Sequence, residues 1–153
     1  MIDFGLSRFY KRGKKMRNAC GTILYVAPEV LRESYDEKCD LWSLGCIVFV
    51  MLFGYPPFDG ESETEVMDQL LQDKPFTIDD DDDVVISDEA KDFLLKLIER
   101  NPRKRLSAKQ AMKVGSPRGV SCGPYLNLLK ISSRIFKGLR CSNINVILFV
   151  SLE

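Results

Sequence analysis

The most informative absence in this 153-residue sequence is that of histidine, which does not occur at all. Histidine is the commonest general base and a frequent metal ligand, so its absence excludes Ser-His-Asp and Cys-His hydrolysis and histidine-based metal centres. The five cysteines form no C-x-x-C pair and their number is odd, which argues against a disulfide framework. No secretory signal is recognisable either, so we expect a reducing, cytoplasmic location.

Long apolar runs are also lacking, although a membrane-spanning helix needs about 20 predominantly apolar residues. The longest candidate, Leu41 to Phe53, is bounded by Asp40 and Gly54, and it fits a buried core helix better than a membrane span. Hydrophobic residues make up 45% of the chain and charged residues 29%, as in an ordinary globular domain. We therefore expect a single folded domain with no membrane contact.

Acidic side chains become scarce in the last part of the chain. Residues 1–113 hold 17 basic and 21 acidic side chains, whereas residues 114–153 hold 5 basic and 1 acidic. The same boundary opens a stretch rich in Gly, Pro and Ser, after which helix caps are missing. We predict a folded unit over residues 1–113 and an unrelated tail over 114–153, disordered or mistranslated; an authentic tail that docks on a partner is the alternative. Within the tail, Tyr125 to Phe136 fits one amphipathic helix.

Basic side chains gather between Arg8 and Arg17, where six of them occur without sustained periodicity. A run of this kind is usually a solvated loop, and that is the first interpretation. A segment that meets phosphate groups or an acidic partner is the alternative. Nucleic acid is not expected as a partner, because no aromatic or groove-reading pattern accompanies the charges.

Helical signals recur through the first 113 residues and predict a mainly α fold. Proline suits a first helical position, Asp and Ser suit N-caps, and glycine suits a helix end. Capping-box spacing marks two of the starts, at Ser62 and Ser107, and Asp40 is expected as the N-cap of the buried helix. The expected helices run from Pro28 to about Ser34, from Asp40 or Leu41 to Phe53, from Ser62 to about Asp73, from Ser87 through Ile98, and from Ser107 to Lys113.

Apolar spacing predicts which helix faces are buried. In the helix after Ser87 the periodic positions are Ala90, Phe93, Leu94, Leu97 and Ile98. In the helix after Ser62 the expected inner face consists of Val66, Met67, Leu70 and Leu71. Between these helices, Asp79 to Asp83 predict a solvated surface loop, since a calcium site would need the spaced ligands and glycine of an EF-hand loop.

Five motifs follow one another in an order typical of one family. They are Asp3-Phe4-Gly5, "GTILYVAPEVL" at 21–31, "DLWSLG" at 40–45, "GYPPF" at 54–58 and "NPRKRLSA" at 101–108. Together they resemble the second half of a Ser/Thr protein kinase domain, in which D-F-G and A-P-E bound the activation segment. The wording of "YDEKCDLWSLGCI" and "GYPPFDGES" is most similar to the calcium/calmodulin-dependent and calcium-dependent kinase group. The resemblance covers residues 1 to about 113 and implies the C-terminal helical lobe.

The resemblance also implies roles for single residues. Asp3 would bind the Mg²⁺ that bridges the phosphates of ATP, because a hard dication prefers carboxylate oxygen. Phe4 would set the position of this aspartate, and Gly5 would supply backbone freedom. Thr22 would lie under the acceptor side chain of a protein substrate.

Further residues are implied to be structural or to define regulation. Glu29 of the A-P-E triplet would form a buried ion pair with Arg105, and Asp40 would hold the backbone of the catalytic loop. Asn18 stands where family members switched by phosphorylation carry Thr or Ser. Phosphate at that position is therefore not expected to order this segment.

Other parts of the kinase machinery have no counterpart in this sequence. The glycine-rich loop, its partner lysine and the catalytic loop, which holds an aspartate base and an asparagine metal ligand, precede D-F-G in kinases. No residue here is assigned to catalysis, and we expect these 153 residues alone to be inactive, because phosphoryl transfer depends on positioning by those parts. The expected identity is a fragment of an ATP-dependent protein Ser/Thr kinase. The alternative is a non-catalytic module that binds substrates or regulators.

Overall fold

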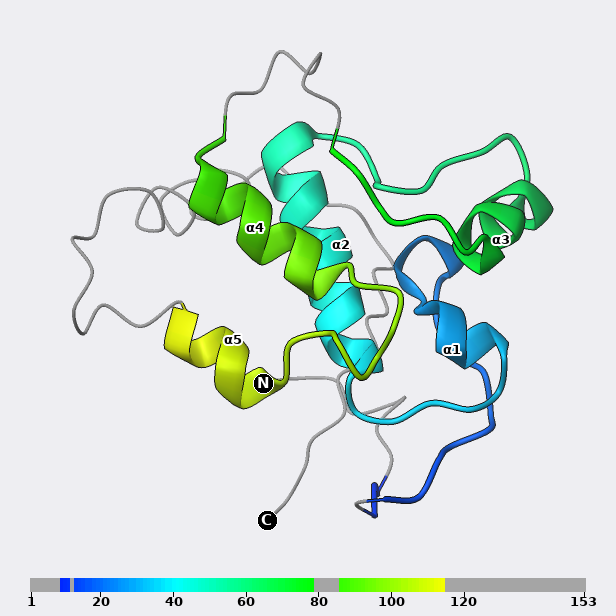
Figure 1. Cartoon of the computed structure of the whole chain (residues 1–153). Helices are drawn as coiled ribbons and strands as arrows, with labels where there is room; N and C mark the ends of the chain where they lie inside the picture. Colours follow the sequence, from blue (N-terminus) through cyan, green and yellow to red (C-terminus); the bar gives the residue numbers. More distant parts are fainter. Residues whose placement is uncertain (1–8, 12, 79–85, 115–153) are drawn as a thin grey trace.

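The computed structural model of the chain describes residues 9–11, 13–78 and 86–114, and these contain helices and one isolated bridge but no strand of a sheet. The prediction of a mainly α fold is confirmed. The helices are η1 (Ile23–Tyr25), α1 (Pro28–Leu31), α2 (Cys39–Phe53), α3 (Glu63–Leu71), α4 (Asp88–Leu97) and α5 (Ala108–Val114). Figure 1 shows α4 crossing in front of α2, with α1 and α3 to one side. The expectations for Asp79 to Asp83 and for Tyr125 to Phe136 fall outside the described residues.

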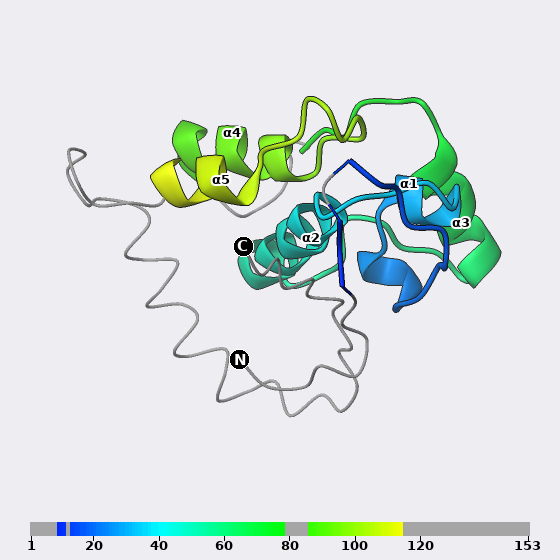
Figure 2. The ribbon, with the colours of Figure 1, turned by 90° about the horizontal axis from the view of Figure 1, so that it is seen from below.

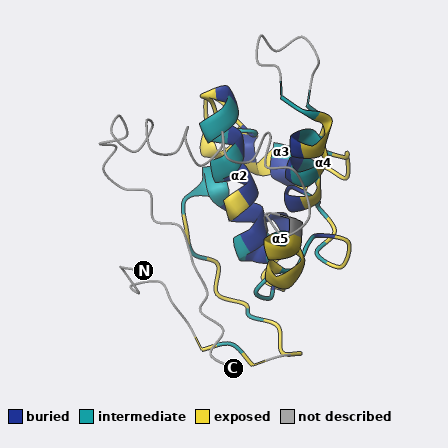
Figure 3. Cartoon of the chain, turned by 90° about the vertical axis from the view of Figure 1, so that its left-hand side faces the viewer, coloured by how far each residue is buried: buried dark blue, intermediate teal, exposed yellow. Residues whose placement is uncertain are grey.

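Helix α2 lies at the centre of the core, because it is apolar almost all round and contacts both α4 and η1. Figure 2 shows α4 and α5 together on one side of α2. In Figure 3 the buried positions of α2 lie toward α3 and α4. The buried core includes Tyr35, Trp42, Cys46, Phe49, Val66, Leu70, Leu94 and Ile98. Within the described residues, none of the helices combines the length and apolar character that crossing a bilayer requires.

Helices α2 and α4 approach each other closely at Gly45. A methyl group added there would lie 2.8 Å from Cγ1 of Ile98 and 2.9 Å from Cβ of Leu97. Only glycine lets the backbones come this close, since real carbon atoms do not share such distances. The far end of α2 is also set by glycine: Gly54 has a φ of 85°, and its amide donates to the carbonyl of Val50 at 2.9 Å, as predicted.

Serine hydroxyls begin three of the helices, as predicted. The hydroxyl oxygens of Ser62, Ser87 and Ser107 each lie 3.3 Å from the amide nitrogen three residues later. At Ser107 the capping box is complete, because Oε1 of Gln110 accepts from the Ser107 amide at 2.9 Å. At Ser62 the box is only half formed, since Oε2 of Glu65 accepts instead from the amide of Glu61 at 3.0 Å.

The start of α2 differs from the prediction that Asp40 is its N-cap. The helix begins at Cys39 after Lys38, and Asp40 lies inside the first turn. The physical reason is the preceding turn, in which Oδ1 of Asp36 accepts from the amide of Lys38 at 3.1 Å. The carbonyl of Asp36 also accepts from the amide of Cys39, so the chain is already coiling before Asp40 is reached.

Helix α1 ends earlier than predicted, at Leu31 rather than near Ser34. The chain leaves the helix because Glu33 adopts a left-handed conformation with a φ of 53°. The amide of Ser34 then reaches back to the carbonyl of Glu29 at 3.1 Å, which closes the end of the helix.

Helix α3 also differs in its end and in its buried face. It ends at Leu71 and not near Asp73. Val66 and Leu70 are buried, whereas Met67 is 36% exposed and Leu71 38% exposed, so the predicted inner face was wrong for two of its four members. All four positions fit a helical period, but periodicity alone does not predict how much of a wide apolar face a neighbouring element covers.

Candidate functional site

The candidate site residues divide between the described and the remaining parts of the chain. The triplet Asp3-Phe4-Gly5 lies outside the described residues, so its roles stay predictions. The other candidates, Thr22, Glu29, Asp40 and Arg105, are all described. Among the described residues, no group of three or more Cys, Asp or Glu side chains is arranged to hold a metal ion. Asp3 therefore stays the candidate for magnesium on the chemistry of its carboxylate.

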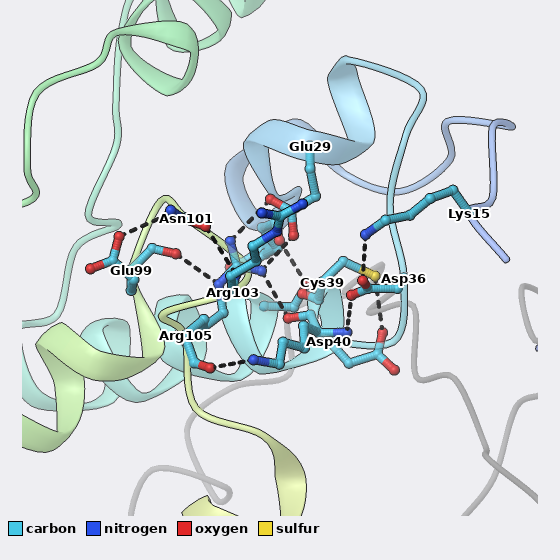
Figure 4. A network of polar contacts seen from close by, with 12 residues as sticks. Lys15, Glu29, Asp36, Cys39, Asp40, Glu99, Asn101, Arg103 and Arg105 are labelled. Atoms are coloured by element: carbon cyan, nitrogen blue, oxygen red, sulfur yellow. Dashed lines mark hydrogen bonds and ion pairs between the residues drawn. The ribbon is translucent and has the colours of Figure 1, made fainter. Parts of the chain in front are cut away.

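Glu29 and Arg105 form the bidentate ion pair that the resemblance implied (Figure 4). Nη1 of Arg105 lies 2.5 Å from Oε1 of Glu29, and Nη2 lies 3.0 Å from Oε2. The two side chains are 8% and 0% exposed, respectively. The planar guanidinium fits both carboxylate oxygens at once, a geometry that a lysine does not provide. The pair fastens α1 to the segment between α4 and α5.

Arg105 makes further contacts on its other sides. Its Nε donates to the carbonyl of Glu99 at 2.8 Å, and Nη1 donates to the carbonyl of Lys38 at 2.9 Å. Its guanidinium also lies over the ring of Trp42, 5.1 Å from the centroid, as a cation–π contact. The buried charge is therefore compensated by one carboxylate, two carbonyls and an aromatic face. One side chain joins α1, the start of α2 and the end of α4.

Asp40 lies half-buried in the first turn of α2, beside the buried thiol of Cys39. A carboxylate in a first turn is favoured by the helix dipole. Burial raises the pKa of the Cys39 thiol, and the charge of Asp40 raises it further. Burial also raises the pKa of Cys46 to about 12. Both thiols stay protonated near neutral pH and are poor nucleophiles, so this part of the core carries no cysteine chemistry.

Thr22 begins the turn that leads into η1. Its carbonyl accepts from the amide of Tyr25 at 2.9 Å, while its side chain makes no capping bond to η1. The turn is fastened to α2 because the hydroxyl of Ser43 donates to the carbonyl of Tyr25 at 2.8 Å. Sequence reasoning missed Ser43, although a serine inside an otherwise apolar helix was the available signal.

The contacts in the described residues fix the positions of two segments, the A-P-E triplet and the Thr22 turn. The A-P-E triplet is locked by a buried ion pair, and the Thr22 turn is held on the core helix by a hydroxyl. These contacts hold the Thr22 turn and the A-P-E triplet in a fixed orientation on the core.

This chain is similar to protein kinases over most of its length. Residues 1–115 match the family described as "Protein kinase domain". The chain is 42% identical over 113 residues to calcium-dependent protein kinase 4 of Plasmodium berghei (strain Anka), which covers 74% of this chain and 21% of the relative. It is 44% identical over 110 residues to calcium-dependent protein kinase 11 of Arabidopsis thaliana, covering 72% and 22%. Calcium-dependent protein kinase 27 of Oryza sativa subsp. japonica is 40% identical over 129 residues, covering 83% and 19%. The chain thus spans about a fifth of the length of these curated relatives.

Proposed function

The chain belongs to the protein kinase domain family, and from this premise we propose that it is part of an ATP-dependent protein Ser/Thr kinase of the calcium-dependent type. The complete domain would transfer the γ-phosphoryl group of ATP to Ser or Thr of protein substrates. The observation that carries the proposal is the buried pair of Glu29 and Arg105, because it anchors the end of a segment that runs from D-F-G to A-P-E.

The proposed roles of the site residues follow the family pattern. Asp3 would bind Mg²⁺, which when bound neutralises charge on the nucleotide phosphates, with Phe4 and Gly5 setting the position of this carboxylate. Thr22 would lie beneath the acceptor side chain of the substrate. Asp40 would hold the backbone of the catalytic loop in the complete domain.

The function can be tested with a chimera. The matched residues of the Arabidopsis calcium-dependent protein kinase 11 are replaced by those of this chain, and phosphoryl transfer from ATP to a peptide is measured with calcium present. We expect the chimera to be active, and Asp3→Asn to lower its kcat by more than about a hundredfold, since charge stabilisation in the transition state is lost. Asp92→Asn, on the exposed side of α4, is the matched control. A folded chimera without activity, beside an active parent, would contradict the proposal.

We propose further that these 153 residues on their own do not catalyse phosphoryl transfer. They contain no G-x-G-x-x-G phosphate loop and no H-R-D-x-x-x-x-N catalytic loop. Without those parts the nucleotide is not positioned and no side chain receives the proton of the acceptor hydroxyl. The measurement is incorporation of labelled phosphate by the purified chain with ATP and Mg²⁺. Incorporation that disappears in Asp3→Ala would show that the chain is active after all.

A second candidate function is a non-catalytic module that binds the substrates or regulators of a kinase. The observation in its favour is the exposed apolar pair of Met67 and Leu71, one turn apart on α3. Purified chain is added to an active calcium-dependent kinase and its peptide substrate. A binding module slows phosphorylation in proportion to its concentration, and Met67→Asp with Leu71→Asp removes the effect. An unchanged rate at all concentrations excludes the module.

A further inference from the structure

The segment before the Thr22 turn lies against the three residues that lead into α2. We call residues 13–18 the basic segment and residues 35–37 the anchor strip. The two are joined by one antiparallel bridge, in which the amide of Met16 donates to the carbonyl of Tyr35 at 2.8 Å and the amide of Tyr35 donates back at 3.2 Å. The hydroxyl of Tyr35 also donates to the carbonyl of Asn18 at 2.6 Å. Because Tyr35 is completely buried, this hydrogen bond ties the backbone of a loop to a side chain that is fixed in the core.

The next two residues of the anchor strip contact the same part of the chain. Asp36 forms an ion pair with Lys15, which Figure 4 shows reaching across to it. Glu37 accepts a hydrogen bond from the hydroxyl of Tyr10, and this bond raises the pKa of Tyr10. Consecutive residues of the anchor strip therefore meet Tyr10 and the basic segment at several points.

These contacts are more than a solvated basic loop would make. The apolar side chain of the basic segment, Met16, is half-buried and packs against the hydrophobic core. Lys15 is 49% exposed but pairs with Asp36 of the anchor strip, and the neighbouring Lys14 and Arg17 are exposed as well. The segment thus has one face toward the core and one toward solvent.

On each side of the Thr22 turn, a side-chain hydroxyl donates a hydrogen bond to a backbone carbonyl. Before the turn, the Tyr35 hydroxyl bonds to the carbonyl of Asn18; after it, the Ser43 hydroxyl bonds to the carbonyl of Tyr25. Both donors are buried, and they come from the anchor strip and from α2. Each bond ties a loop carbonyl to a donor that is fixed in the core, and the Ser43 hydroxyl also lies 3.3 Å from the carbonyl of Cys39 in its own helix.

We propose that Tyr35 and Ser43 are paired positioning residues, whose hydroxyls clamp the backbone on either side of Thr22 and hold residues 19–24 in one orientation without a bound ligand. The statement that this turn faces a protein substrate rests on the proposed function. The clamping is a property of the folded chain by itself.

The test is amide hydrogen exchange, followed by NMR in the 153-residue chain. The reporters are the amides of Met16 and Tyr25, which bond to Tyr35 and Thr22, and the amide of Ile98, which bonds to Leu94 at the end of α4, reports global unfolding. We expect Tyr35→Phe to accelerate exchange at Met16 about twofold to tenfold, and Ser43→Ala to do the same at Tyr25, because each loses one hydrogen bond. Exchange at Ile98 should change by a smaller factor.

The matched control is Tyr55→Phe, which removes a phenol hydroxyl from a half-exposed ring at the far end of α2. It should leave Met16 and Tyr25 unchanged. The proposal is overturned if neither clamp variant accelerates its own reporter, or if each reporter accelerates only in step with Ile98.

If Tyr35→Phe fails to fold, Ser43→Ala decides by itself, because it removes the other hydroxyl and leaves the buried Tyr35 ring in place. Unchanged exchange at Tyr25 in Ser43→Ala, or acceleration only in step with Ile98, then contradicts the clamp. If the clamp variants accelerate exchange as expected while the kinase chimera is inactive, the proposed function is contradicted and the clamp is not.

Discussion

Among the ion pairs of the described residues, Glu29 with Arg105 and Lys15 with Asp36 both join segments that are distant in sequence, yet they differ in almost every other respect. Glu29 and Arg105 are 8% and 0% exposed and bond through two pairs of atoms. Lys15 and Asp36 are 49% and 22% exposed and bond through one. Water screens the second pair, so its net contribution is small, whereas the first pair depends on every partner being present. Around the exposed pair of Lys15 and Asp36, the two segments are held together by backbone and hydroxyl hydrogen bonds more than by charge.

Breaking the buried pair should have the largest effect. Arg105→Ala leaves the Glu29 carboxylate in the interior without its partner, and we expect the free energy of unfolding to fall by about 3 to 5 kcal/mol. Urea denaturation followed by circular dichroism measures this change. The control is the double variant Glu29→Leu with Arg105→Met, which should lose less because no buried charge is orphaned. A loss below about 1 kcal/mol in Arg105→Ala would place this pair in the same class as a surface pair.

The packing beside the buried pair should give the second largest effect. Gly45→Ala forces α4 away from α2, and with it Glu99, whose carbonyl accepts from Arg105. We expect a loss of about 1 to 3 kcal/mol, the usual cost of overpacking. In the same urea denaturation, the neighbouring Leu44→Ala, at a site that is 40% exposed, should lower the free energy of unfolding by less than Gly45→Ala does. An unaffected Gly45→Ala would mean that the helices can separate freely.

Breaking the exposed pair should have a much smaller effect. Lys15→Met should change the free energy of unfolding by about 1 kcal/mol or less, and by less still at high ionic strength. Denaturation at about 0.01 M and about 1 M salt separates the electrostatic part, because the Debye length shrinks about tenfold between them. Lys14→Met, which changes an exposed lysine outside the pair, is the control. A loss that is large and independent of salt would contradict the contrast between the two regions.

The smallest predicted effect is a dependence on pH that arises at Asp36. Burial raises the pKa of this carboxyl, but its hydrogen bonds with Lys15 and with the Lys38 amide, together with their positive charges, bring it below its ordinary value. A carboxyl whose pKa is lower in the folded state contributes stability above its unfolded pKa of about 4 and loses it as the pH falls through the folded pKa. The stability difference between the parent and Asp36→Asn should therefore shrink as the pH falls below about 4. A difference that stays constant into acid contradicts this account.

Local signals in the sequence predicted most of the helical frame. Ser87 and Ser107 were placed correctly as caps, and Gly54 as the end of α2, because each of these bonds joins residues three or four positions apart. The error at Asp40 has a local cause of another kind. Asp36 and Asp40 both stand before an apolar run, and sequence alone does not decide which carboxylate closes the turn.

Contacts between distant residues were not accessible from spacing. The bond from Tyr35 to Asn18 spans 17 positions and that from Ser43 to Tyr25 spans 18, and no periodic rule links such positions. The pair of Glu29 and Arg105 was anticipated only through the resemblance to kinases. Met67 and Leu71 were misplaced because an apolar stripe does not reveal which neighbour will cover it.

The long sequence separation between Glu29 and Arg105 bears on how the chain folds while it is being synthesised. A ribosome makes Glu29 first, and the arginine that neutralises it follows 76 residues later. Until then the carboxylate keeps its water, α1 has no charged partner, and the core around Trp42 lacks the cation that covers its ring. Contacts of such long separation form slowly, since a long stretch of chain must be ordered before they add stability. A residue made 76 positions later therefore completes the contacts of α1.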